Sequence, residues 1–199
     1  MTNIERVAVH PIVLLSIADH HHRIHGNSKD KRVIGILLGD CFKGQVNVLQ
    51  SFAIPFEEDP NDPQVWFADT NFIDDMYALH QKVTLKESIV RWYSSKTTVC
   101  QNDLDIHHTL LRYNPNAIFI TTDVTAKDPH EIPVAAFIGA ERVRPDGKPI
   151  VSSFQNVPTI VDFLEVEEIG VEHLLRDIKD VDMSEIGTTL TNSVHGLAA

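Results

Sequence analysis

Apolar and polar residues recur along the chain with two different periods, and these periods predict strands interrupted by helices. A short strand is predicted at residues 7–9, and a helix follows from Pro11, because proline is favoured at the first helical position. The apolar residues at helical spacing are Leu14, Ile17 and Ile24. Gly26 and Asn27 are expected to end this helix.

Two runs rich in β-forming residues come next, at residues 31–41 and 44–56. Gly44 stands between them and marks a turn, so the two runs are expected to form a hairpin. The following stretch, "EEDPNDPQ", is predicted as an acidic, proline-containing loop.

The remaining elements continue the same alternation. A helix is predicted over 71–83, with Phe72, Met76, Leu79 and Val83 as its apolar line. A strand over 87–95, a helix over 102–113 capped by Asn102 or Asp103, and strands over 116–124 and 132–143 follow. The β character persists over 147–165, and "EEIGVEHLLRDIKD" at 167–180 is an amphipathic helix, with a last helix from about Ser184.

This order predicts a mixed α/β (α+β) fold, with a mixed sheet flanked by helices. We expect one domain over residues 1–163 and a C-terminal helical extension over 164–199.

Composition narrows the function. The 199 residues carry a formal charge of -11, which is unfavourable for contact with a phosphate backbone and favours protein partners. Only two cysteines are present, and the N-terminus has no apolar signal core, so we expect a cytoplasmic and nuclear protein without a membrane span.

Six stretches in this order resemble the MPN (Mov34) domain family. They are "VAVHPIVLLSIADHHHRI", "RVIGILLGD", "SFAIPF", "FIDDMYALHQKV", "VRWYSS" and "EEIGVEHLLRDIKD". The resemblance covers Val7 to about Asp180 and implies a curved mixed β-sheet flanked by helices. Within the family, "DPQVWFAD" and "GVEHLLRDIKD" are most similar to the non-catalytic members of the proteasome regulatory-particle lid, more than to those of the COP9 signalosome or the translation initiation factor.

The catalytic branch of this family resembles a zinc isopeptidase. Two imidazoles and one carboxylate hold the zinc, a glutamate before the "xxGxLLG" strand acts as general base, and a serine helps to hold the oxyanion. In this chain the resemblance puts Arg32 at the glutamate place, and Ser94 and Lys96 at the histidine places. Arginine cannot act as a base near neutral pH, and neither Ser94 nor Lys96 is a normal zinc ligand.

The loop after Lys96 is two residues shorter than the family pattern in this alignment. Closing it puts Asn102 at the serine place and leaves Asp105 to occupy the carboxylate-ligand place. We therefore expect no catalytic residues, no metal and no cofactor. A lone aspartate at a helix start is usually a cap or a solvated charge, which applies to both Asp103 and Asp105.

Three rebuilt sites remain as alternatives. Asp103 with His107, and His21 with His25, are each four residues apart and would share a helix face, which suits weak binding of a transition metal. Cys100 could serve as a thiol nucleophile with His107 or His108 as its base.

If the chemistry is absent, function should lie in surfaces. The helix from Pro11 and the helix over 71–83 have apolar residues beyond a single core-facing stripe, and the C-terminal helix has an apolar face of its own. The interface candidates are Ile12, Leu15, Ile73, Tyr77, Ile169, Leu174 and Ile178.

The resemblance implies a structural subunit that pairs with and positions the zinc-dependent deubiquitinating MPN subunit and contacts other lid subunits. An isolated chain could form homodimers through the same surfaces. The alternatives are a divergent metal hydrolase that uses Asp105, or the equivalent subunit of the signalosome or of the initiation factor.

Overall fold

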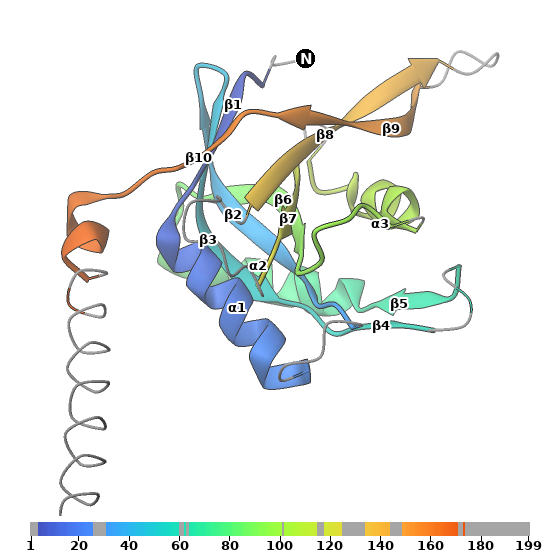
Figure 1. The fold of residues 1–199 in the computed structure, drawn as a ribbon, viewed down its shortest axis with the longest axis horizontal. Helices are drawn as coiled ribbons and strands as arrows, with labels where there is room; N and C mark the ends of the chain where they lie inside the picture. The colour runs from blue at the N-terminus through green and yellow to red at the C-terminus, as the bar shows by residue number, and fades with distance from the viewer. Residues whose placement is uncertain are drawn as a thin grey trace, which may run out of the picture. The chain divides into compact units, whose positions relative to one another are not determined.

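The computed structural model describes residues 4–25, 31–59, 62, 64–100, 102–114, 118–124, 134–143, 149–170 and 173. Eight strands pair into one mixed sheet in the order β10-β1-β3-β2-β6-β7-β8-β9, and β4 and β5 form a separate two-stranded hairpin (Figure 1). The strands are β1 (Arg6–Val9), β2 (Ile34–Phe42), β3 (Gln45–Ala53), β4 (Phe56–Glu58), β5 (Trp66–Ala68), β6 (Ser88–Ser94), β7 (Ile118–Thr122), β8 (Val134–Val143), β9 (Pro149–Val157) and β10 (Thr159–Val161). Parallel pairs (β1 with β3 and β10, β6 with β7) stand among antiparallel ones, which confirms the predicted mixed fold.

Helices cover both faces of this sheet. Helix α1 (Pro11–His25) packs Val13 and Ile17 into a cluster with Val9, Val48 and other inward-facing strand residues. Helices α2 (Thr70–Val83) and α3 (Asp103–Leu110) pack on a second cluster formed by the side chains of the opposite face. Along β2 the alternation is direct, because Leu37 joins the first cluster while Ile36 and Leu38 join the second.

The predicted hairpin over residues 31–56 is confirmed as β2 and β3. Its turn is Lys43–Gly44, both with positive φ (50° and 81°), which glycine adopts without strain. Gly35 on β2 is required by packing, since a Cβ there would collide with the Tyr93 ring and the Phe52 carbonyl oxygen. Gly35 therefore lets β2 lie close to β3 and β6 just after the segment that carries Arg32.

Two features differ from the sequence-based expectations. The acidic stretch after residue 56 begins with the short hairpin β4–β5, which Glu57 and Phe67 pair across, so it is more than a loop. On α2, Leu79 and Val83 are exposed, and the core-facing side instead carries Ile73 and, by a ring stack on Phe52, His80. The residues of α2 that face the sheet are therefore those at positions 73, 76, 77 and 80, and the predicted apolar line was displaced around the helix from this side.

The chain divides into two compact units, Met1–Asp162 and Phe163–Ala199. In the second unit, the described residues form a helix over 165–170, whose first turn includes a bond from Leu164 N to Glu167 Oε2. The rest of the predicted 167–180 helix and the helix from Ser184 lie outside the described residues, apart from His173. Within the described part of the chain, no helix is long and apolar enough to cross a membrane.

Candidate functional site

The structure brings together three of the positions that sequence analysis assigned to a degenerate metal site. Arg32 precedes β2, Ser94 ends β6, and Asn102 stands directly before α3. All three side chains are buried, with exposed fractions of 4% or less. Lys96 is half-buried, and its backbone N–H donates to Ser94 Oγ over 3.3 Å. Sequence segments that are 60 to 70 residues apart therefore meet at one point.

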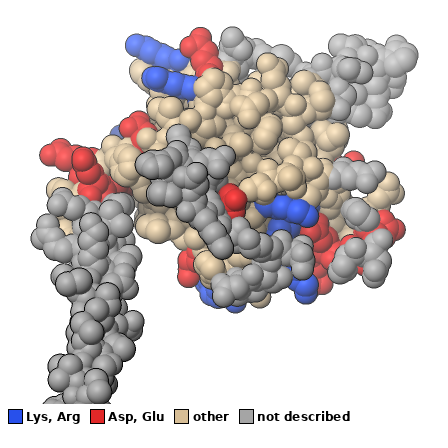
Figure 2. Space-filling model, viewed as in Figure 1, with Lys and Arg blue, Asp and Glu red and all other residues tan. Residues whose placement is uncertain are grey.

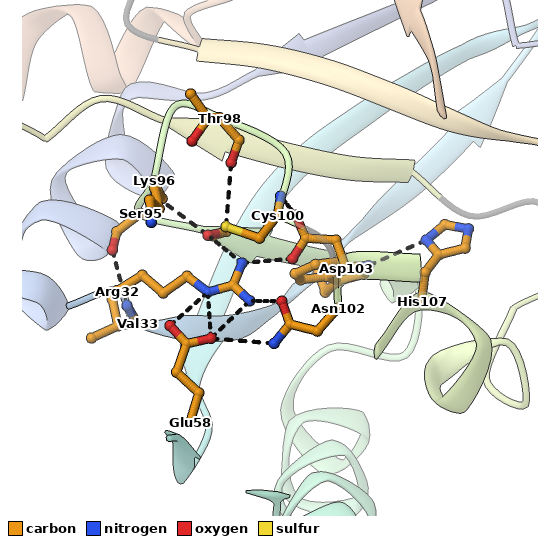
Figure 3. Close-up of polar contacts among 12 residues, drawn as sticks. Arg32, Val33, Glu58, Ser95, Lys96, Thr98, Cys100, Asn102, Asp103 and His107 are labelled. Atoms are coloured by element: carbon orange, nitrogen blue, oxygen red, sulfur yellow. Dashed lines mark hydrogen bonds and ion pairs between the residues drawn. The ribbon is translucent and has the colours of Figure 1, made fainter. Parts of the chain in front are cut away.

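Every nitrogen of the Arg32 guanidinium faces an oxygen at this point (Figure 3). Nε donates to both carboxylate oxygens of Glu58, at 3.2 and 3.1 Å. Nη1 donates to Asp103 Oδ1 at 2.6 Å and lies 3.5 Å from Ser94 Oγ. Nη2 donates to Asn102 Oδ1 at 2.9 Å and lies 3.1 Å from Glu58 Oε2. The guanidinium thus joins β2, β4, β6 and the start of α3.

The aspartate of this site is Asp103 and not Asp105. Asp103 is fully buried, and its Oδ2 accepts a second bond from the backbone N–H of Cys100 at 2.6 Å. Asp105 is exposed, and the structure puts Asp103, not Asp105, beside Arg32. Asn102 is the residue that caps α3 in sequence, but its side chain makes no capping bond because it is committed to Arg32 and Glu58.

The spacing of residues along α3 explains the difference between the two aspartates. Asp103, Ile106, His107 and Leu110 are the buried residues of the helix, which is the i, i+3, i+4, i+7 pattern of one face. Asp105 lies about 200° around the helix from Asp103, on the solvent side. This signal was present in the sequence. Glu58 carried no comparable signal, because its pairing with Arg32 spans 26 residues and depends on how β4 folds back.

The electrostatics of the cluster keep Arg32 charged. Burial disfavours the cation, but the Asp103 and Glu58 carboxylates outweigh that effect and raise the pKa of Arg32. Burial raises the pKa of the Asp103 carboxyl, while Arg32 and the Cys100 N–H act in the opposite direction. A permanently protonated group therefore stands where the family resemblance expects a general base.

The donor set does not fit the zinc that the family resemblance implies. A guanidinium fills the centre of the cluster, and the oxygens around it come from two carboxylates, an amide and a hydroxyl, with no imidazole or thiolate among them. Across the residues that the structure describes, no group of three or more His, Cys, Asp or Glu side chains is arranged to hold a metal ion.

The alternative pairs have other partners. His107 is buried, and the indole N–H of Trp92 donates to its Nδ1 at 3.3 Å, whereas Asp103 faces Arg32. His21 Nδ1 lies 3.0 Å from Ser95 Oγ, which also accepts from the Val33 N–H. The side chain of His25 lies outside the described residues. His107 thus links α3 to β6, and His21 links α1 to the residue that follows β6.

Cys100 lacks the features of an activated thiol. Its Sγ is 3.7 Å from the Thr98 carbonyl oxygen, and burial raises the pKa of the thiol although Arg32 opposes this. A raised pKa lowers the thiolate fraction at neutral pH, which is the opposite of what nucleophilic catalysis requires.

Arg91 is a second buried arginine and has no counterpart to these contacts. It is 1% exposed, its backbone φ is 147°, and none of its three guanidinium nitrogens has a hydrogen-bond partner among the residues that the structure describes. Burial lowers the pKa of Arg91 to about 9. The residue sits opposite a register irregularity between Leu37 and Leu38 of β2. Sequence analysis did not single it out.

The predicted interface residues divide into three groups. Ile12, Leu15 and Ile169 are about half exposed, at 52%, 49% and 54%, and are accessible on their units. Ile73 is completely buried in the core, so the expectation that it meets a partner is wrong, and Tyr77 is half-buried beside it. Leu174 and Ile178 lie outside the described residues.

Charged side chains on the face seen in Figure 2 lie in several separate groups, with Lys and Arg close to Asp and Glu, and the lysines and arginines coloured there do not form one continuous patch. Such a face offers no track for a phosphate backbone, in keeping with the net charge of -11.

Comparison with known sequences gives related proteins over nearly the whole chain. The family described as "JAB1/Mov34/MPN/PAD-1 ubiquitin protease" matches residues 2–116. The chain is 42% identical over 197 residues to "26S proteasome non-ATPase regulatory subunit 7" of Drosophila melanogaster, covering 98% of this chain and 58% of that protein. It is 43% identical over 195 residues to the "homolog B" of that subunit in Arabidopsis thaliana, covering 98% and 62%.

A third relative is "26S proteasome regulatory subunit RPN8" of Saccharomyces cerevisiae, at 36% identity over 194 residues, covering 97% of this chain and 57% of that protein. The chain therefore spans little more than half the length of these curated relatives.

Proposed function

The chain belongs to the JAB1/Mov34/MPN/PAD-1 family, and from this premise we propose that it is a non-catalytic structural subunit of the 26S proteasome regulatory-particle lid. Its role would be to pair with and position the zinc-dependent deubiquitinating MPN subunit. We further propose that residues 1–163 form the MPN domain, that residues 164–199 form a helical extension towards other lid subunits, and that the protein works in the cytoplasm and nucleus.

The observation that carries the non-catalytic half of this proposal is the Arg32 cluster. A guanidinium bonded to Asp103, Glu58 and Asn102 cannot accept a proton from water, and its charge opposes a dication at the same place. Ser94, at a histidine place, is buried against this guanidinium. A hydrolase built on Asp105 would have to use an exposed carboxylate on the solvent side of α3, whereas Asp103 faces Arg32.

The proposed pairing with a second MPN subunit rests on the exposed side of α1, which carries Ile12 and Leu15 and is called the α1 surface below. Ile12 and Leu15 lie three residues apart, on the same side of the helix, and about half of each side chain remains exposed. Exposed apolar residues are unremarkable singly, but a pair on a helix whose other side is embedded in the core suits helix-to-helix packing with a second domain of the same fold. Without that partner, the same surface would favour homodimers.

The direct test is reconstitution. The purified chain is mixed with a zinc-loaded MPN deubiquitinase subunit and analysed by size-exclusion chromatography with light scattering. We expect a one-to-one heterodimer and a ubiquitin-chain cleavage rate that depends on the presence of the chain. Two separately eluting species, at concentrations above those of the subunits in cells, would contradict the proposal. Capture of signalosome or initiation-factor subunits instead of lid subunits from native extract would favour the alternative assemblies.

A further inference from the structure

The β4–β5 hairpin requires a stabilising contact outside its own ladder. Each strand has three residues, and the pair forms a sheet separate from the main one. Two-stranded hairpins of this size are marginally stable alone in water. Its main-chain bonds include only a few cross-strand contacts, such as Asp59 N to the Val65 carbonyl oxygen at 2.9 Å.

Two residues of β4, Phe56 and Glu58, lie on the same side of the strand and contact Arg32. Glu58 takes the Nε bond through both carboxylate oxygens, and the Phe56 ring lies under the guanidinium with 5.6 Å between Cζ and the ring centroid. Asn102 closes the triangle, since its Nδ2 donates to Glu58 Oε2 at 3.3 Å while its Oδ1 accepts from Arg32. The hairpin and the start of α3 are therefore joined through one cation and one amide.

The oxygens around the guanidinium would repel one another without it. The side chain of Asp103 is 0% exposed and that of Glu58 is 27% exposed, so water does not fully solvate either carboxylate. A buried carboxylate that loses its counter-charge pays a large desolvation cost. The site thus needs a resident cation whether or not it catalyses anything.

We propose that the Arg32 guanidinium is this resident cation, filling the structural role that a bound metal ion would have, and that it fixes the β4–β5 hairpin to the start of α3. The metal of the family's catalytic branch is replaced by a covalently attached cation with a planar donor fork. The chain's fold at this point is then independent of metal supply.

Replacement of the side chain should leave an oxygen-lined void that accepts a free guanidinium. In Arg32→Ala the acceptors on Glu58, Asn102 and Asp103 remain, and their positions match the planar fork that they now bind. Ethylguanidinium at about 10 mM, roughly a hundredfold or more below the molar concentrations at which guanidinium salts unfold proteins, supplies that fork. Ethylammonium has the same charge and no fork, which makes it the matched control ligand.

The experiment measures the thermal midpoint of wild type, Arg32→Ala and Arg112→Ala with each additive. Arg112 pairs with Asp74 at the surface, with 48% and 55% of the side chains exposed, so it controls for the loss of an arginine. We expect ethylguanidinium to raise the midpoint of Arg32→Ala alone, by about 2–4 °C, as suits a chain of this length. Equal shifts in all three proteins, or none in Arg32→Ala, would overturn the resident-cation role.

A second variant tests the hairpin should Arg32→Ala not fold. Glu58→Gln removes one charge at a partly exposed position, and hydrogen exchange then follows the Asp59 amide against the β2–β3 amides. We expect exchange at Asp59 to accelerate by about tenfold, the size of one charged hydrogen bond, while β2 and β3 stay unchanged. An unchanged Asp59 rate would show that Arg32 does not hold the hairpin.

Discussion

Arg32 and Asp103 form an ion pair whose side chains are 1% and 0% exposed, with Nη1 2.6 Å from Oδ1. The pair links Arg32, two positions before β2 begins, to the first residue of α3, 71 positions later. A buried pair of this kind contributes modestly when intact, but the loss of one partner leaves an uncompensated charge in the interior.

Asp103→Asn is therefore expected to destabilise the chain strongly, by about 3–5 kcal/mol in the free energy of unfolding. The substitution keeps the size of the side chain but leaves Arg32 with Glu58 as its only anion. Urea unfolding followed by tryptophan fluorescence measures the change. Asp74→Asn breaks the exposed pair with Arg112 and should cost about 0–1 kcal/mol. Similar losses for the two variants would contradict the account of the buried pair.

Replacement of Arg91 is expected to change the free energy of unfolding in the opposite direction, towards higher stability. Its buried guanidinium has no hydrogen-bond partner in the described part of the chain, and burial lowers the pKa of Arg91 to about 9. The folded state therefore disfavours the charge that the side chain carries at neutral pH. Arg91→Met keeps much of the volume and removes the charge, and we expect it to stabilise the chain by about 1–4 kcal/mol. A destabilised Arg91→Met protein in the same urea titration would count against this interpretation.

The backbone at Arg91 gives a separate comparison. A φ of 147° is strained for any residue with a Cβ and is ordinary for glycine. Arg91→Gly should therefore be more stable than Arg91→Ala by about 1–3 kcal/mol, although glycine is normally the less stable residue inside a strand. Because both variants lack the guanidinium, their difference isolates the backbone. An Arg91→Ala protein that is the more stable of the two would refute the strain.

His107 predicts how stability depends on pH. Burial, with smaller effects of Arg91 and His108, lowers the pKa of His107 from 6.5 to about 3. The unfolded chain then binds a proton that the folded chain does not between these values. Stability from this group is complete above about pH 6.5 and is lost as the pH falls towards 3, at up to about 1.4 kcal/mol per pH unit.

His107→Asn should reduce that slope, since asparagine cannot be protonated and its Oδ1 can accept the bond from the Trp92 indole. Urea unfolding between pH 4 and 7 measures the slope for wild type and variant. His22→Asn, at an exposed position, is the control for the loss of a histidine side chain. Parallel slopes for wild type and His107→Asn would show that His107 titrates normally in the folded chain.

The α1 surface predicts a selective loss of pairing. Ile12→Glu combined with Leu15→Glu puts charge on two half-exposed positions, so the isolated fold should change by no more than about 0.5 kcal/mol for each substitution. Binding to the MPN deubiquitinase should weaken by about a hundredfold or more, as for central apolar contacts. Phe42→Glu, at the 65% exposed end of β2, is the matched control and should bind normally. Undiminished binding by the double variant would exclude α1 from the interface.

Sequence reasoning recovered the elements of the main sheet because their signals are local. The helices at 11–25 and 70–83 and the β2–β3 hairpin follow from apolar spacing, Pro11 and Gly44. The hairpin β4–β5 was missed because its strands are only three residues long, because β4 contains two glutamates, and because long-range packing on the core and against Arg32 supports it.

Only some of the residues of the Arg32 cluster could be predicted from the sequence. Arg32, Ser94 and Asn102 were found through the family resemblance, whereas Glu58 was not, since no local pattern links it to a residue 26 positions away. The place of Asp103 beside Arg32 was not predicted, for a different reason. The buried face of α3 was readable from the spacing of Ile106 and Leu110, but the alignment of the shortened loop was given more weight.

The most direct test of the central claim measures bound zinc and ubiquitin-chain cleavage on the same sample of the purified chain. The chain is incubated with excess zinc, dialysed, analysed by mass spectrometry for metal, and assayed with ubiquitin chains, beside a catalytic MPN deubiquitinase treated identically. We predict no stoichiometric zinc and no cleavage, because the Arg32 guanidinium already occupies the site. One equivalent of zinc per chain, together with cleavage that a chelator abolishes, would contradict the account.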